Sequence, residues 1–344
     1  MKYNLLGRTG LWVSELCLGT MTYGGVGFWK SIGELPQDAV DKQIKTALDS
    51  GINFIDTANI YSFGESEKLL GQSIKNLGIN REEIILATKV RGQMKNETQN
   101  RVGLSRQAIM YEVEQSLKRL QTDYIDLYQI HGVDPLVPID ETLRALNDLV
   151  TSGKVRYIGL SNLAAWQIMK AIGISEKNCW SRFESIQAYY SIAGRDLERE
   201  IVPLAEDQNL SILVWSPLAG GFLTGKFEKD SQNPEGARRS TFDFPPVDKE
   251  RGFECVDAMK KIAENRGVSV AQIALAWCNH QKRITSVIIG AKTQEQLIAN
   301  IDSTKIKLTT DELSLLDGVS QLPVEYPGWM LSFQQSDRLN NNNG

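Results

Sequence analysis

The sequence predicts an α/β protein of the (β/α)8 TIM-barrel class, and the prediction depends on the number and alternation of its apolar runs. Eight short apolar runs between residues 16 and 289 alternate with helical patterns. Buried parallel strands are typically such continuous apolar runs, and eight strand–helix units close this barrel. A doubly wound sheet is the alternative. No linker divides the chain, however, and no Gly-x-Gly-x-x-Gly follows the first run, so the barrel is favoured.

The expected elements follow from the period of the apolar residues. The expected strands are Leu16–Gly19, Asn53–Asp56, Ile84–Lys89, Ile125–His131, Val155–Leu160, Glu184–Gln187, Ser211–Trp215 and Ser286–Ile289. The expected helices are Pro36–Ser50, Ser105–Leu120, Ile139–Thr151, Leu163–Gly173, Leu197–Asp207 and Ser269–His280. Ser105 has the side chain of a helix N-cap.

Three further segments lie outside this alternation. Tyr3–Leu6 and Leu11–Ser14 flank a Gly-containing turn, which predicts a hairpin that caps the bottom of the barrel. The Gly- and Pro-containing segment Ser216–Glu250 is long enough to be a lid or binding loop. We expect a single domain over residues 1–330 and a C-terminal tail over 331–344. The low-complexity end of that tail, Asn340–Gly344, is expected to be disordered.

Composition argues against several classes of protein. The net charge of −4 argues against a broad nucleic-acid surface. No apolar stretch approaches the roughly 20 residues of a membrane span, so no membrane insertion is expected. No secretory signal is visible at the N-terminus. The four cysteines are scattered and there are two histidines, which favours a cytoplasmic protein and no metal site.

Ionisable side chains stand at the ends of three expected strands. These are Asp56, Lys89 and His131, and Tyr61 follows Asp56 by five residues. In α/β proteins the C-terminal ends of parallel strands carry the chemistry. Each residue alone has an ordinary structural explanation: a capping aspartate, a packed tyrosine, a lysine paired with Asp56, or a hydrogen-bonded core histidine. Their convergence on one mouth of the barrel predicts a catalytic group.

The four residue types suit proton transfer to a carbonyl oxygen. A free tyrosine has a pKa of about 10, too high for efficient acid–base work near neutrality. The Lys89 ammonium is expected to lower the pKa of Tyr61, with Asp56 holding Lys89 charged. His131 is expected to donate to the carbonyl oxygen. Lys89 as a Schiff-base nucleophile of an aldolase is the alternative. It is disfavoured because a carboxylate partner keeps the amine protonated.

The segment from Gly51 to Tyr61, continued by Gly64, Glu65 and Gly71, resembles the signature of the aldo-keto reductases. Gly19-Thr20, Lys89, the strand ending in His131, and Gly159-Leu160-Ser161-Asn162 occur in the family's order, and the resemblance spans residues 3 to about 320. It is closest to the branch of bacterial NADP-dependent reductases and potassium-channel β subunits. It implies a barrel fold, the same four catalytic residues, and a hydride supplied by a nicotinamide.

The resemblance also implies a set of cofactor residues. Ser161, Asn162 and Gln187 are expected to bind the carboxamide, and Trp215 to stack on the nicotinamide; a helix cap and core packing are their structural alternatives. The remaining residues expected at the cofactor are Gly19, Thr20, Met21, Asp56, Ser216, Pro217, Leu218, Gly220, Leu223, Gly225, Lys226, Arg238, Arg239, Gly290, Ala291, Lys292, Gln296 and Asn300.

Two parts of this set differ from known patterns. Gly220 to Lys226 has the spacing of a phosphate-binding P-loop, but Phe227 replaces its Ser or Thr, so we interpret the segment as a loop over the pyrophosphate. Family members often have Lys, Arg and Glu at positions 290, 296 and 299, where this chain has Gly, Gln and Ala. Lys292 and Gln296 remain available to a 2′-phosphate. NADPH is therefore the expected cofactor, with NADH as the alternative.

Aromatic residues in the family's pocket loops predict a substrate site. The expected pocket is built from the segments Tyr23–Trp29, Phe63, Met94–Arg101 and Tyr326–Trp329, with Tyr23 among its residues. Trp29, Phe63 and Trp329 suggest an aromatic wall suited to hydrophobic aldehydes, and packing among the loops is the alternative. The leading hypothesis is NADPH-dependent reduction of aldehydes or ketones, with a small-molecule carbonyl as the partner. The alternative is a nucleotide-sensing regulatory subunit that resembles the channel β subunits. The physiological substrate and the oligomeric state are left open by the sequence.

Overall fold

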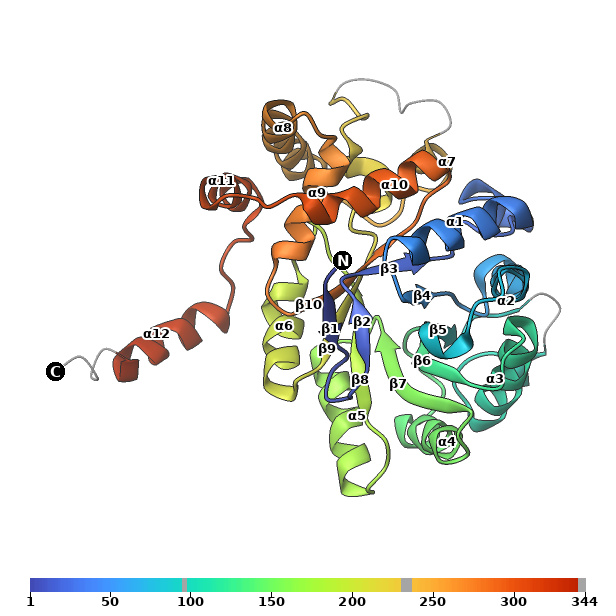
Figure 1. The fold of residues 1–344 in the computed structure, drawn as a ribbon. Helices are drawn as coiled ribbons and strands as arrows, with labels where there is room; N and C mark the ends of the chain where they lie inside the picture. The colour runs from blue at the N-terminus through green and yellow to red at the C-terminus, as the bar shows by residue number, and fades with distance from the viewer. Residues whose placement is uncertain (95–97, 230–236, 340–344) are drawn as a thin grey trace.

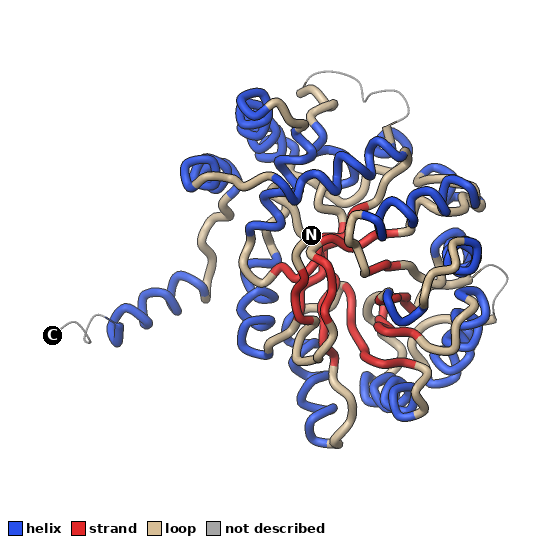
Figure 2. Tube along the Cα trace, viewed as in Figure 1, coloured by secondary structure: helices blue, strands red, loops and turns tan. Residues whose placement is uncertain are grey.

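The computed structural model describes residues 1–94, 98–229 and 237–339, without the side chains of residues 336–339. Its centre is a closed barrel of parallel strands in the order β10-β3-β4-β5-β6-β7-β8-β9. Figures 1 and 2 show the strands at the centre and the helices around them. The predicted (β/α)8 barrel is therefore confirmed, with neighbours along the chain pairing around the ring and β10 closing against β3.

The barrel strands are short, apolar and largely buried, as parallel strands covered by helices must be. Each lies within two residues of its expected bounds: β3 (Leu16–Gly19), β4 (Phe54–Asp56), β5 (Ile85–Val90), β6 (Ile125–Ile130), β7 (Val155–Ser161), β8 (Phe183–Tyr189), β9 (Ser211–Trp215) and β10 (Ile284–Ile289). Every residue of β5 and β6 is buried. The site residues on these strands are consequently held in a rigid, tightly packed frame.

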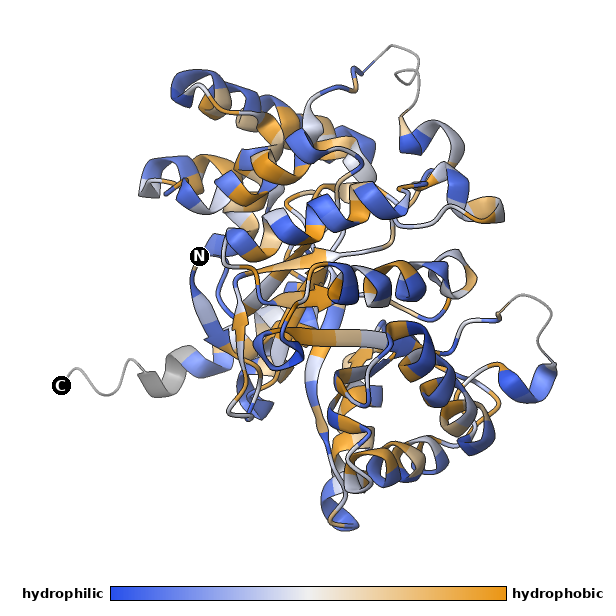
Figure 3. Cartoon of the chain, turned by 45° about the vertical axis from the view of Figure 1, so that its right-hand side comes forward, coloured by the Kyte–Doolittle hydropathy of each residue, from blue (hydrophilic) through white to orange (hydrophobic). Residues whose placement is uncertain are grey.

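The helices pack their apolar stripes on the outside of the barrel, where a large hydrophobic core lies between the two layers. Figure 3 shows apolar strands inside and hydrophilic outer helix surfaces. The six expected helices are confirmed as α1 (Gln37–Asp49), α3 (Arg106–Leu120), α4 (Ile139–Thr151), α5 (Ala165–Lys177), α6 (Leu197–Gln208) and α9 (Val270–His280). The structure adds α2 (Glu65–Asn76), α7 (Arg238–Thr241), α8 (Lys249–Arg266), α10 (Gln294–Asp302) and α11 (Thr310–Ser320). Ser105 caps α3 as predicted, accepting a hydrogen bond of 3.2 Å from the amide of Ala108.

The predicted hairpin is present and closes one end of the barrel. Strands β1 (Tyr3–Leu5) and β2 (Trp12–Ser14) pair antiparallel. Leu6 and Val13 are fully buried in the interior cluster that also contains Phe54. Apolar residues therefore fill the barrel from the hairpin end, and the polar side chains of the site collect at the opposite end.

The long segment after β9 and the C-terminal tail are more structured than expected. The segment after β9 carries a 3-10 turn, Ala219–Thr224, and helix α7, while its residues 230–236 lie outside the described residues. At the C-terminus, α12 (Gly328–Leu339) crosses the expected domain boundary at 330 and stands apart from the barrel (Figure 1). The expected disorder of 340–344 falls outside the described residues. Of the helices in the described ranges, none has the length and apolar character needed to cross a membrane.

Candidate active site

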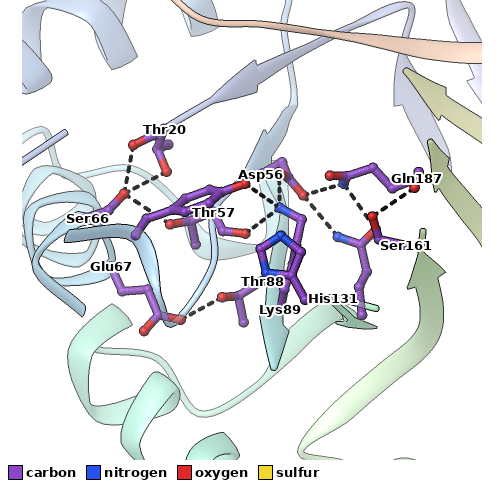
Figure 4. Close-up of polar contacts among 12 residues, drawn as sticks. Thr20, Asp56, Thr57, Ser66, Glu67, Thr88, Lys89, His131, Ser161 and Gln187 are labelled. Carbon is purple, nitrogen blue, oxygen red and sulfur yellow. Dashed lines mark hydrogen bonds and ion pairs between the residues drawn. The ribbon is translucent and has the colours of Figure 1, made fainter. Parts of the chain in front are cut away.

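Three neighbouring strands carry the predicted catalytic residues to one mouth of the barrel. Asp56 is the last residue of β4, Lys89 is the last but one of β5, and His131 directly follows β6. The strands β4, β5 and β6 pair side by side in that order. Figure 4 shows Asp56, Lys89 and His131 converging. The predicted convergence of these side chains follows from the pairing of the strands.

Lys89 lies at the centre of the group and is fully buried. Its Nζ forms an ion pair with Asp56, donates to the carbonyl oxygen of Thr57 at 2.8 Å, and lies 3.3 Å from the hydroxyl oxygen of Tyr61. Burial by itself lowers the pKa of Lys89, but Asp56 and Tyr61 outweigh burial and raise the pKa above its ordinary value. The amine is therefore protonated, which argues against Lys89 as a Schiff-base nucleophile.

Tyr61 begins a tight turn, Tyr61–Gly64, between β4 and α2. Ser62 and Phe63 have positive φ angles of 48° and 54°, and Gly64 has a φ of 90°. Burial raises the pKa of Tyr61, Lys89 lowers it, and the net direction is upward. Lys89 thus acts on the pKa of Tyr61 in the expected direction, but burial, which was left out of the expectation, outweighs it in the free protein. Tyr61 is protonated at neutral pH, the form that a general acid requires.

His131 is neutral in this environment. Burial lowers its pKa to about 3, helped by the positive charges of Lys89 and Arg91. The imidazole ring meets the ring of Tyr61 edge to face, with centroids 5.9 Å apart. A neutral imidazole has one N–H donor, so His131 and the Tyr61 hydroxyl can both donate to one carbonyl oxygen.

The residues expected at the carboxamide lie next to the catalytic group. The hydroxyl of Ser161 donates to the carbonyl oxygen of Gln187 at 2.8 Å, and Nε2 of Gln187 donates to Asp56 at 2.9 Å. Asn162, at a φ of 60°, donates from Nδ2 to the carbonyl oxygen of His131 at 3.2 Å. Among the described residues, nothing donates a hydrogen bond to Oε1 of Gln187, which leaves this atom as an acceptor for an amide.

Buried charges behind the site hold the turn that carries Tyr61, and sequence reasoning missed them. Arg119 on α3 pairs with Glu67 at 2.6 Å and with Glu112 at 3.3 Å. Asn59, two residues before Tyr61, donates to Glu112 at 2.9 Å. A Cβ on Gly64 would lie 2.7 Å from Cδ of Arg119, so only glycine lets the turn pack this closely. The signal in the sequence was that Glu67 and Glu112 occupy positions on the buried faces of α2 and α3, where an acidic side chain needs a partner.

A chain of aromatic rings crosses the mouth, and only part of it was expected. Trp29 meets Tyr61 with centroids 5.5 Å apart, as the expected pocket wall requires. Phe28, beside it, contacts Phe242 at 5.2 Å. Phe244 stacks on Trp215 at 5.7 Å and an interplanar angle of 9°. Phe28 lies in the expected pocket loop Tyr23–Trp29, and Phe242 and Phe244 lie in the expected binding loop Ser216–Glu250. The three residues were not named because the loops that carry them are far apart in sequence.

Two of the expected pocket residues are not part of this wall. Tyr23 is fully buried in the core between barrel and helices, so its ring offers no surface to a substrate, and this assignment was wrong. Trp329 lies on α12, away from the mouth, and its ring contacts Tyr326. Phe63 is half-buried in the turn after Tyr61, near Gly27. The loop Met94–Arg101 includes residues 95–97, outside the described residues.

The two arginines after β9 differ sharply in their surroundings. The guanidinium of Arg239 donates to the carbonyl oxygens of Ala219 and Pro245, both at 2.9 Å, and pairs with Asp243. Nε of Arg238 is buried and has no hydrogen-bond partner among the described residues. Burial lowers the pKa of Arg238, and the charge of Arg239 lowers it further. Arg239 thus stabilises the loop after β9 through contacts within the loop. Arg238 is the cation available to a ligand.

Arg238 belongs to a cluster of three cations that fits a phosphate-bearing cofactor. The pKa of Lys292 is lowered by burial and by the charges of Arg238 and Lys226. The carboxylate of Glu34 acts in the opposite direction and raises the pKa of Lys292, but the net direction is downward. Positive charges that lie close together are stabilised when an anion joins them. Two phosphate groups of a dinucleotide meet this requirement, so the donor set fits the cofactor that the sequence implies.

The other expected cofactor residues line the same end of the barrel, with several side chains already engaged. A Cβ on Gly19 would lie 2.6 Å from Cγ2 of Ile288, which explains the glycine. Thr20 is fully buried, with its hydroxyl 2.8 Å from that of Ser66, so its side chain faces α2. The amide of Lys292 donates to Gln296, and Nδ2 of Asn300 donates to the carbonyl oxygen of Gly290. These bonds shape the loop between β10 and α10.

In the loop expected to fold over the pyrophosphate, several backbone amides are hydrogen-bonded within the loop itself. The amide of Ala219 donates to the carbonyl oxygen of Ser216, and that of Gly220 to the Ser216 hydroxyl. The amides of Gly221 and Leu223 donate to the carbonyl oxygen of Leu218. Because these amides are already engaged, they are not free anion donors in this conformation. The remaining expected residues at this end of the barrel are Met21, Pro217, Gly225 and Ala291.

The fold and site define an oxidoreductase barrel with a buried Asp–Lys–Tyr group, and comparison with known proteins agrees. Residues 15–321 match the Aldo/keto reductase family, and the chain belongs to that family. It is 38% identical to the uncharacterized oxidoreductase YrpG of Bacillus subtilis, over 93% of this chain and 96% of that protein. It is 34% identical to the versiconal hemiacetal acetate reductase of Aspergillus parasiticus, over 92% and 96%. A putative voltage-gated potassium channel subunit beta of Schizosaccharomyces pombe is 35% identical, over 95% and 96%.

Proposed function

We propose that this protein reduces aldehydes or ketones to alcohols with NADPH, using Tyr61 as the general acid. The observation that carries the proposal is the buried Lys89 ammonium, which joins Asp56 to the hydroxyl of Tyr61. A buried charge of this kind is costly unless it serves a partner. Here the partner is a tyrosine whose ionised form the ammonium stabilises.

The reaction can be derived from these side chains. The carbonyl oxygen of the substrate accepts hydrogen bonds from Tyr61 and from the neutral His131, which polarise the C=O bond. A bound nicotinamide supplies the hydride to the carbonyl carbon. Tyr61 then gives its proton to the oxygen, and Lys89, 3.3 Å away, stabilises the phenolate that forms. Asp56 keeps Lys89 charged throughout.

NADPH is the proposed cofactor because of the three cations Lys226, Arg238 and Lys292. The pKa of Lys292 is lowered by the charges of Arg238 and Lys226 more than Glu34 raises it, which supports a net positive charge at the mouth. NADPH carries one phosphate more than NADH, so such a cluster favours NADPH. The test compares the two cofactors in turnover with the same aldehyde; equal kcat/KM values for both would contradict this part of the proposal.

The catalytic assignment is tested by Tyr61→Phe, with Tyr3→Phe as the matched control. Tyr3 is on the hairpin at the other end of the barrel, and its hydroxyl bonds to the carbonyl oxygen of Gly51. We expect Tyr61→Phe to lower kcat by about 10²- to 10⁴-fold and to retain NADPH binding, whereas Tyr3→Phe keeps the parent kcat. Full turnover by Tyr61→Phe would show that another group is the acid.

The rings Phe28, Trp29 and Phe242 support hydrophobic aldehydes as the substrate class. Aromatic walls bind flat apolar groups by burial and by edge-to-face contact. A panel of aromatic and short aliphatic aldehydes, measured at one NADPH concentration, tests this; the aromatic members should have the lower KM. We also propose a cytoplasmic location, supported by the four cysteines, all of which are free.

A regulatory role is the second candidate, because one relative is named as a potassium channel subunit beta. In that case the site would serve to sense the nucleotide, and turnover would be slow. The discriminating experiment combines a carbonyl panel with co-purification from membranes. Stoichiometric recovery of a membrane protein together with negligible turnover would favour the regulatory role over the reductase.

A further inference from the structure

Two glutamine side chains converge on the same oxygen of Asp56. Nε2 of Gln129 and Nε2 of Gln187 each donate to Oδ1 of Asp56 at 2.9 Å, while Oδ2 pairs with Lys89. Nε2 of Gln187 also donates to Oε1 of Gln129 at 3.2 Å. Figure 4 shows Gln187 and Lys89 on opposite sides of Asp56. Both oxygens of the carboxylate are therefore fixed by buried donors.

The orientation of both amides follows from the chemistry of the carboxylate. An ionised carboxylate only accepts hydrogen bonds, so each glutamine must direct its NH₂ group at Asp56. Gln187 then has a second N–H for Oε1 of Gln129, as observed. Every polar atom of the Gln129 amide is in use within this group, and its orientation is set by Asp56 and Gln187.

Gln129 is placed for this contact and for no contact with a ligand. It pairs with Lys89 on β5 and with Gly159 on β7 in the strand register, and it is fully buried. A Cβ on Gly159 would lie 2.5 Å from Oγ of Ser185 and 3.1 Å from Cγ of Gln129, so the glycine makes room for both side chains. A buried amide costs free energy unless its hydrogen bonds are made. Those bonds are made to Asp56 and Gln187.

We propose that Gln129 is a positioning residue for the reduction: it fixes Asp56 so that Lys89 stays charged and in contact with Tyr61. The inference rests on the proposed function, since the contact of Lys89 with Tyr61 matters only if Tyr61 is the acid. Without the Gln129 amide, Asp56 Oδ1 keeps only the hydrogen bond from Gln187, so the carboxylate is held less firmly against Lys89. The phenolate of Tyr61 is then less stabilised in the reaction.

Gln129→Met tests the proposal, because methionine keeps the length of the side chain and removes its amide. We expect kcat to fall by about tenfold, a change of about 1.4 kcal/mol in the barrier, with the KM for the aldehyde changed less than about twofold. Gln37→Met is the matched control, since the Gln37 amide also donates to an aspartate, Asp41 at 2.7 Å, but within the outer helix α1. The control should keep the parent kcat. A parent-like kcat in Gln129→Met would overturn the proposal.

Gln129→Glu supplies a pH signature that a purely structural role would not produce. A glutamic acid donates to Asp56 only when protonated, and when ionised it repels Asp56. We expect its kcat to approach the parent value at about pH 5.5 and to fall steeply as pH rises through the pKa of the new carboxyl group. Gln129→Met should be low over the whole range. An equal loss at all pH values in Gln129→Glu would contradict the positioning role.

A measurement without turnover separates this inference from the proposed function. The ammonium protons of Lys89 are shielded from water and bonded to Asp56 and Thr57, so its ¹⁵N resonance should be observable in the parent and absent in Lys89→Met. We expect Gln129→Met to broaden or remove this resonance and Gln37→Met to retain it. If the parent shows no turnover, the proposed function fails, while an unchanged Lys89 resonance in Gln129→Met overturns the role of Gln129.

Discussion

The indole Nε1 of Trp215 donates a hydrogen bond of 3.1 Å to Oδ1 of Asn162. The same Asn162 donates to the carbonyl oxygen of His131, so one side chain joins the end of β9 to the residue after β6. The indole ring is thereby fixed in the plane in which Phe244 stacks on it. A ring held in this way is a preorganised surface for another flat ring.

Trp215→Phe should weaken cofactor binding because phenylalanine keeps an aromatic face but cannot donate to Asn162. Loss of one net hydrogen bond costs about 0.5–1.5 kcal/mol, so the NADPH Kd should rise about 2- to 12-fold, with a smaller effect on kcat. The measurement is a fluorescence titration with NADPH. Trp166→Phe, at an exposed position on α5, is the control and should bind as the parent does. An unchanged Kd in Trp215→Phe would mean that the ring needs no anchoring.

The barrel and its polar end were predictable because they follow from local patterns. Asp56 and Lys89 end apolar runs, and the pairing of consecutive parallel strands then brings them together. Tyr61 was also identified from the sequence, because it follows Asp56 by only five residues. The effect of Lys89 on its pKa was expected, but the larger opposing effect of burial was not, because it depends on packing that a sequence does not show.

The residues that were missed depend on contacts between distant segments. Phe28 and Phe242 meet across the mouth although more than 200 residues separate them. Tyr23 was misassigned because its neighbours in sequence are pocket residues, whereas the turn after β3 directs its ring into the core. Gln129 had a usable signal: it is a polar residue inside an apolar run, two positions before His131 and on the same face of the strand.

His131 predicts a pH dependence of stability. Its folded pKa of about 3 lies below the ordinary value of 6.5, so the unfolded chain binds this proton more readily. The contribution to stability is present above pH 6.5 and is lost as the pH falls toward 3. Urea unfolding should show the parent losing stability between pH 6.5 and about 4 faster than His131→Gln. Parallel curves for the two proteins would indicate that His131 titrates normally when folded.

The neighbours Arg238 and Arg239 should respond oppositely to the same substitution. Arg238→Met removes a half-buried cation that is repelled by Arg239 and lies over the ring of Phe242. Relief of the repulsion should give a higher Tm without cofactor, and the NADPH Kd should rise about tenfold. Arg239→Met removes bonds to Ala219, Pro245 and Asp243 and should lower the Tm. Thermal unfolding and NADPH titration of both variants test this. A lower Tm in Arg238→Met would show that the contact with Phe242 outweighs the repulsion from Arg239.

The buried pairs of Arg119 predict a large loss of stability on one substitution. The side chains of Glu67 and Glu112 are 0% and 2% exposed, and Arg119→Met removes the cation that pairs with both carboxylates. Removing one partner of a buried pair costs about 3–5 kcal/mol, because the remaining charge is uncompensated. Arg106→Met is the control on the same helix, since Arg106 and its partner Asp148 are 47% and 39% exposed. That surface pair should contribute at most about 1 kcal/mol. Urea unfolding measures both, and similar losses for the two variants would mean that Glu67 and Glu112 take up protons in place of the lost arginine.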